Sequence, residues 1–103
     1  MYLIVLCTCP DNDSAKQIAE YLVQEKLAAC VNILPGLTSV YSWQGKVESS
    51  TEVQLIIKTE AKKFDALSEQ INQLHPYDVP EIIALNIQQG DSNYLNWISE
   101  SLK

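Results

Sequence analysis

The length of two neighbouring segments with strand-like composition is the feature that most constrains the fold. Residues 28–43 and 46–59 are rich in branched and aromatic side chains, and Gln44-Gly45 is predicted to form a two-residue turn between them. At about 3.3 Å per residue, each arm of this hairpin spans roughly 45–50 Å. The helix expected to begin near residue 13 covers only about 20 Å. About half of the hairpin should therefore extend beyond the rest of the chain.

The extending half of the hairpin would leave apolar and aromatic side chains in water. Such surfaces, and open strand edges, are usually covered by another chain, so the pattern predicts a closed homo-oligomer. The predicted interface residues, with the aromatic ones as anchors, are Leu37, Val40, Tyr41, Trp43 and Val47. In the alternative interpretation, Pro35-Gly36 forms a true loop and the distal hairpin folds back on its own sheet.

The segment before the hairpin predicts a strand followed by a helix. "YLIVLC" is a continuous apolar run, typical of a strand buried on both faces. Ser14 and Gln17 fit a capping box, which indicates a helix start near residue 13. Its residues at helical spacing are Ala15, Ile18, Ala19, Leu22 and Lys26.

The segment after the hairpin predicts a second helix, a strand and a terminal helix. Thr59 is expected to cap the second helix, and Pro76 ends it because it pushes His75 out of helical geometry. "EIIALNI" has the pattern of a buried strand, and Asp91 or Ser92 is expected to cap the terminal helix. The apolar stripe of the second helix consists of Phe64, Leu67, Ile71 and Leu74.

This order of elements predicts one domain over residues 1–103 with an α+β, ferredoxin-like fold. The arrangement is βαββαβ plus a C-terminal helix, with helices on one face of an antiparallel sheet and the first strand between the third and the fourth. That topology brings the end of the first strand and the corner at His75 to the same end of the sheet.

Charge and composition narrow the class of protein. The net charge is -6 and all seven basic residues are lysines, which argues against nucleic acid as a partner. No apolar run approaches the length of a membrane-spanning helix, and the chain is interpreted as cytoplasmic. The three cysteines form no regular disulfide framework, so reduced thiols are expected.

Cys7, Cys9 and His75 are the candidate metal ligands. A thiolate and an imidazole suit copper and zinc, and the predicted topology lets them converge at one end of the sheet. Cys9 would share a face with Cys7 if the strand stayed regular up to Pro10. The competing interpretations are a packed strand thiol for Cys7 and a helix-terminal residue at the subunit edge for His75. Cys30 is expected in the core.

Three long blocks of the sequence resemble one known family. "EKLAACVNILPGLTSVYSWQGKVE", "HPYDVPEIIAL" and "YLNWI" are similar to the CutA divalent-cation-tolerance proteins. The resemblance implies a ferredoxin-like subunit in a homotrimer, a mostly cytoplasmic location in bacteria, and a link to copper and other divalent metals. It also implies ligand roles for Cys7 and His75, whereas Leu74 stands where the family carries a further histidine. Cys9 is the residue that could compensate.

The leading hypothesis is therefore a cytoplasmic homotrimer that binds copper or another divalent metal ion, without enzymatic activity. The alternative is a small-molecule signalling trimer like the PII-type proteins, or a scaffold, with a ligand cleft between subunits. That cleft would be lined by Lys46, Lys58, Tyr77 and Glu81. The absence of arginine and of a glycine-rich phosphate loop argues against a nucleotide in it.

Overall fold

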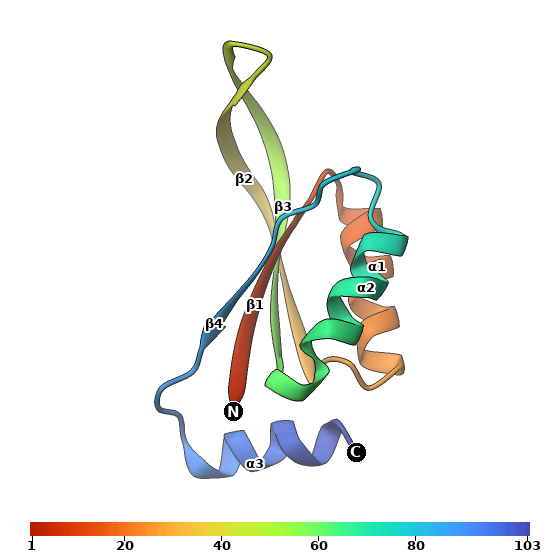
Figure 1. The fold of residues 1–103 in the computed structure, drawn as a ribbon, viewed down its shortest axis with the longest axis vertical. Coiled ribbons are helices and arrows are strands. Elements are labelled where there is room, and N and C mark those ends of the chain that lie inside the picture. The colour runs from red at the N-terminus through yellow and green to blue at the C-terminus, as the bar shows by residue number, and fades with distance from the viewer.

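The computed structural model describes residues 1–103 and contains four strands and three α-helices (Figure 1). In chain order these are β1 (Tyr2–Cys9), α1 (Asn12–Gln24), β2 (Cys30–Trp43), β3 (Lys46–Glu60), α2 (Phe64–Leu74), β4 (Ile82–Asn86) and α3 (Ser92–Ser101). A short 3-10 helix, Ala61–Lys63, leads from β3 into α2. None of the helices is both long enough and apolar enough to cross a membrane.

The four strands form one antiparallel sheet with the order β2-β3-β1-β4. Helices α1 and α2 lie side by side on one face of this sheet, whereas α3 lies across the end opposite the hairpin tip (Figure 1). Strand β1 therefore lies between β3 and β4, as the sequence predicts. The predicted α+β, ferredoxin-like fold is confirmed.

The core lies between the sheet and the two covering helices. Alternate residues of β1 point towards the helices, because side chains of a strand alternate between its two faces. The other side of the core comes from the predicted stripes of α1 and α2, although Phe64 and Leu74 are only partly buried. The prediction that Lys26 belongs to the stripe of α1 is wrong, because α1 ends at Gln24 and Lys26 is exposed in the following turn with a φ of 59°. The core residues from β1, α1 and α2 are Leu3, Val5, Cys7, Cys9, Ala15, Ile18, Ala19, Leu22, Leu67 and Ile71.

The hairpin of β2 and β3 extends well past the helices, and the molecule measures 45 × 25 × 22 Å (Figure 1). Trp43 pairs with Lys46 across the turn, which is the predicted register. The interpretation in which Pro35-Gly36 forms a loop that folds the hairpin back is wrong. These residues instead form an irregularity between Leu34 and Leu37, after which pairing with β3 resumes.

Two predicted helix caps are corrected by the structure. The cap of α1 is Asp11, whose side chain accepts a hydrogen bond from the backbone N–H of Ser14 at 2.7 Å, so the predicted capping box at Ser14 is wrong. Thr59 is still part of β3, and its hydroxyl donates to the carbonyl of Leu27 at 2.7 Å instead of capping α2. At α3, Asp91 is the cap, as one of the two predicted choices.

The turn at the hairpin tip should be sensitive to substitution because both of its central residues have positive φ angles. Gln44 has φ 51° and Gly45 has φ 79°. A side chain at Gly45 is strained in this region, so Gly45→Ala should lower the free energy of unfolding by about 1 kcal/mol. Gln44→Asn should raise it slightly, because asparagine tolerates positive φ better. Urea unfolding at one fixed protein concentration measures the free-energy change of both variants. Equal stabilities of Gly45→Ala and wild type would contradict the positive-φ turn at Gln44-Gly45.

Candidate metal centre

The structure brings Cys7, Cys9 and His75 together at the end of the sheet where β1 ends. Cys7 and Cys9 lie on the helix-facing side of β1, and His75 follows the last residue of α2, where its extended backbone ends the helix. One ligand atom from each of the three residues lies within 4.8 Å of the others, and all three residues are buried. The strand stays regular through Cys9, which is the condition under which the sequence places both thiols on one face.

His75 is held by hydrogen bonds at both ring nitrogens. Its Nε2 lies 2.7 Å from the carbonyl oxygen of Thr8, and its Nδ1 accepts from the backbone N–H of Tyr77 at 3.0 Å. Because a carbonyl can only accept, this pairing assigns the proton of the neutral ring to Nε2. The expected position of His75 at the subunit edge is wrong. The ring is only 7% exposed, because it turns inward to satisfy the carbonyl of Thr8 near the end of β1.

Tyr77 lies next to His75 and is hydrogen-bonded to Glu52. The Tyr77 hydroxyl donates to Oε2 of Glu52 at 2.6 Å, and the Tyr77 ring lies 4.8 Å from the His75 ring, centroid to centroid. Burial, followed by the hydrogen bond to the Glu52 carboxylate, raises the pKa of the Tyr77 hydroxyl. Tyr77 therefore stays protonated and acts as a hydrogen-bond donor.

Sequence reasoning did not find Glu52. In a regular strand Glu52 alternates with Val53, which faces the helices, so the pattern alone predicts a carboxylate on the open face of the sheet. Glu52 is instead 8% exposed, because it lies just beyond the last β1–β3 pair, Cys9 with Val53, where Tyr77 covers it. Only the hydrogen bond from Tyr77, which is distant in the sequence, identifies Glu52 as part of the surroundings of the cluster.

The two thiols share a hydrogen bond and titrate as a pair. The hydrogen bond to Cys9 and then burial raise the pKa of the Cys7 thiol, whereas the same hydrogen bond lowers the pKa of Cys9. Cys9 is therefore the thiol that ionises first, with Cys7 as its donor. Nearby carboxylates, Asp11 and Glu52 at Cys9 and Glu81 at Cys7, oppose the negative charge on the sulfurs. The same carboxylates attract a cation towards the cluster.

The remaining sequence candidates lie elsewhere. The hairpin residues Val40, Trp43 and Val47 are 68%, 58% and 81% exposed, Tyr41 is also exposed, and Leu37 is half-buried within its own chain. Cys30 is half-buried near Lys58 and not in the core cluster, so the prediction for this residue is wrong.

The four residues of the alternative cleft do not meet within one chain. Lys46 stands at the hairpin tip, whereas Lys58 lies at the other end of β3 and donates to Asn32. Tyr77 is engaged with Glu52, and Glu81 is exposed just ahead of β4. A cleft made of these side chains would depend entirely on the assembly of several chains.

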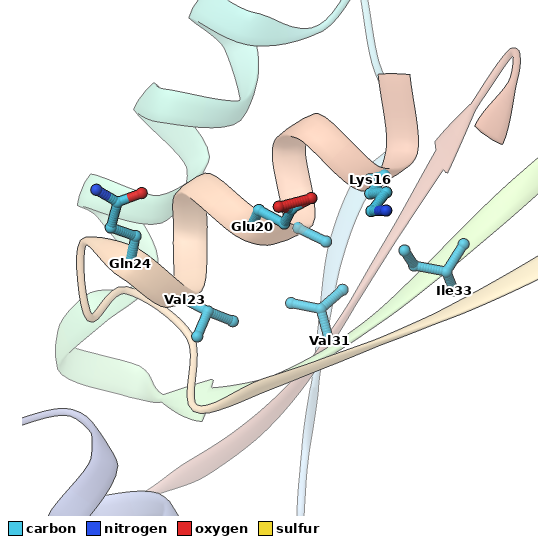
Figure 2. Close-up of a pocket in the computed structure, with 7 residues that line it drawn as sticks. Lys16, Glu20, Val23, Gln24, Val31 and Ile33 are labelled. Carbon is cyan, nitrogen blue, oxygen red and sulfur yellow. The ribbon is translucent and has the colours of Figure 1, made fainter. Parts of the chain in front are cut away.

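A groove that was not predicted from the sequence lies between α1 and the free edge of β2 (Figure 2). It has a volume of about 510 Å³, and in Figure 2 Val31 and Ile33 of β2 face Lys16, Glu20 and Val23 of α1. Its lining includes none of the Cys/His cluster. It is an apolar surface with a charged rim, not a second metal centre.

Comparisons with known proteins agree with the fold. The family model described as "CutA1 divalent ion tolerance protein" matches residues 3–101. A divalent-cation tolerance protein CutA from Thermus thermophilus is 51% identical over 98 residues, which cover 95% of each chain. A solved structure of a divalent cation tolerance protein from Thermus thermophilus has a TM-score of 0.97 at 50% identity and covers all of both chains. The structure of a protein described as periplasmic CutA, from Archaeoglobus fulgidus, has a TM-score of 0.97 at 38% identity, with full coverage of both chains.

His75 should contribute to stability independently of any metal. Replacing it with alanine leaves the carbonyl of Thr8 without its buried donor, which should lower the free energy of unfolding by about 1–3 kcal/mol. His75→Gln should recover part of this loss, because its amide can donate to the same carbonyl. Urea unfolding in the presence of a chelator measures the difference, and Gln73→Ala, on the exposed side of α2, is the control. A His75→Ala variant as stable as this control would contradict the structural role.

Proposed function

Because this chain belongs to the CutA1 divalent ion tolerance family, a non-enzymatic family, we propose that it binds copper or a related metal ion at Cys7, Cys9 and His75. The observation that carries the proposal is the convergence of two thiols and one imidazole within 4.8 Å in a buried position. Thiolate and imidazole are donors that copper and zinc prefer, and no carboxylate belongs to the cluster. This donor set favours these metals over magnesium and calcium.

Cys9 supplies the third donor in this proposal. Leu74 offers no ligand atom, and its partly buried side chain packs against the core. Cys9 shares a face and a hydrogen bond with Cys7, so both sulfurs can approach one ion without rearrangement of β1. Its lowered pKa favours the thiolate, which is the form that binds a metal. The sulfur of Cys9 thus takes over the role of a missing histidine.

The proposal includes a homotrimer. Its support is the exposed apolar surface of the hairpin, together with two free sheet edges, at β2 and β4. A head-to-tail contact between unlike edges closes into a ring when the rotation between copies is right, and the family resemblance suggests three copies. Ile83 and Leu85, each about half exposed on the open face, and the groove beside β2 supply further apolar surface for such contacts (Figure 2).

The proposed location is the cytoplasm. All three cysteines are free, and a reducing compartment keeps thiols in the form that can bind a metal. The Archaeoglobus relative is named as a periplasmic protein, so this part of the proposal concerns the present chain alone.

Metal titration of single variants tests the ligand set. Under anaerobic conditions, Cys7→Ser, Cys9→Ser and His75→Gln should each weaken the binding of Cu(I) or Zn²⁺ at least about tenfold, the loss typical even for residues that only support a ligand. Cys30→Ser is the matched control, because this thiol lies outside the cluster. Competition with a chromophoric chelator measures the affinities. Equal affinities across all four variants would refute the assignment.

The same titration should release protons and should weaken as the pH falls. Both thiols must lose their protons to bind, and the raised pKa of Cys7 keeps it protonated in the free protein at neutral pH. Affinity that does not change between neutral and acidic pH would contradict thiolate ligation.

Light scattering on a size-exclusion column tests the assembly. The wild-type mass should be three times the 11.6 kDa of one chain. Trp43→Glu inserts a charge into the proposed interface and should shift the protein towards smaller species at micromolar concentration. Ala66→Glu, on the exposed side of α2, introduces the same charge elsewhere and should leave the mass unchanged. A wild-type monomer would remove this part of the proposal.

A further inference from the structure

Neither ring nitrogen of His75 is free to bind a metal in the state that the structure describes. Nε2 carries the proton that it shares with the carbonyl of Thr8, and the lone pair of Nδ1 accepts from the backbone N–H of Tyr77. Cys7 and Cys9 are also completely buried. This conformation is a closed state of the cluster, so capture of an ion requires a second, open conformation.

We propose that Tyr77 and Glu52 form a latch that controls access to the Cys/His cluster, which deepens the function proposed above and rests on it for its metal. Tyr77 holds His75 in two ways, since its backbone N–H occupies Nδ1 and its ring packs 4.8 Å from the imidazole. Its hydroxyl is in turn fixed to Glu52 at 2.6 Å. Glu52 lies on β3 directly beyond its last pair with β1, where β3 pairs with Leu37 of β2 alone. One side chain thus ties the corner after α2 to the sheet at the base of the hairpin.

The corner has few other restraints. Residues 76–81 lie between α2 and β4, and none of them appears among the backbone–backbone hydrogen bonds of turns and loops. Val79, at the centre of the corner, is 89% exposed and contributes little packing. Release of the Tyr77 hydroxyl therefore removes the hydrogen bond that joins residues 76–81 to the sheet, and leaves His75 with its bond to Thr8 as the remaining polar link beside the corner. The corner can then swing outward, which frees Nδ1 and exposes the sulfurs of Cys7 and Cys9.

The size of the effect follows from the balance between closed and open states. A hydrogen bond to a charged acceptor stabilises the state that contains it, and its loss raises the population of the open state about tenfold. Because a ligand binds only the open state, its apparent affinity and its association rate rise by the same factor. Tyr77→Phe removes the hydroxyl and keeps the ring, so it isolates the latch from the packing on His75.

Thiol alkylation in the metal-free protein tests the latch. Iodoacetamide is added to the chelator-treated protein, and modification of each cysteine is followed by peptide mass spectrometry. In Tyr77→Phe, the peptide with Cys7 and Cys9 should react about tenfold faster than in wild type, while Cys30 reacts at the same rate. Tyr21→Phe, which removes a hydroxyl on α1 away from all three cysteines, is the matched control and should leave both rates unchanged. An unchanged rate at Cys7 and Cys9 in Tyr77→Phe overturns the proposal.

A double-mutant cycle separates the latch from general loosening of the fold. If Tyr77 acts through Glu52, Tyr77→Phe should accelerate alkylation in the wild-type background but not in the Glu52→Leu background. Equal acceleration in both backgrounds, or a parallel acceleration at Cys30, assigns the effect to destabilisation and overturns the latch.

Metal association completes the test. Stopped-flow mixing with Cu(I) or Zn²⁺ should give an association rate for Tyr77→Phe that is about tenfold faster than for wild type. Should the wild type bind neither ion at this cluster, the proposed metal function fails, yet the alkylation rates still decide whether the latch exists. Normal binding with equal rates in the two proteins overturns the latch and leaves the metal function intact.

Discussion

Strand β3 is the element on which the rest of the structure depends. Its C-terminal half pairs with β1 on one side and β2 on the other, whereas its N-terminal half pairs with β2 alone. The same strand is thus part of the core at its C-terminal end and part of the exposed hairpin at its N-terminal end, with backbone hydrogen bonds to β2 along both parts. The junction between these halves, Cys9 opposite Val53, is also the place where the Cys/His cluster and Glu52 meet. The proposed metal centre and the proposed assembly surface are therefore two consequences of one long strand.

The burial of the cluster gives its residues a structural role in addition to the proposed metal-binding role. Cys7 and Cys9 are core residues that pack against the helices, and His75 satisfies the carbonyl of Thr8. Stability of the protein and the proposed affinity for a metal ion therefore depend on the same side chains. An ion that binds here must replace hydrogen bonds that the closed state already makes, which lowers the net affinity and favours metals that bind thiolates strongly.

The structure also suggests how the proposed site can tolerate the loss of one ligand. Leu74 is the last residue of α2 and packs against the core, whereas Cys9 reaches the cluster from the neighbouring strand. In the proposed site, a sulfur from the sheet thus stands in for an imidazole at the end of α2. Because sulfur is the softer donor, this exchange shifts the preference of the proposed site towards copper and zinc.

The sequence by itself determined the order of the elements, the hairpin register and the three residues of the cluster. Those predictions rest on local signals: alternation along β1 put Cys7 and Cys9 on one face, and Pro76 ended α2 at His75. Only the tertiary structure decided the rest, because it depends on contacts between distant segments. Thr59 bonds to Leu27 instead of capping a helix, and Glu52 is buried by Tyr77, 25 residues away. Neither contact can be recognised in the sequence, because each is a single pairing of two side chains or a side chain and a carbonyl. Such a pairing produces no repeating pattern of residues.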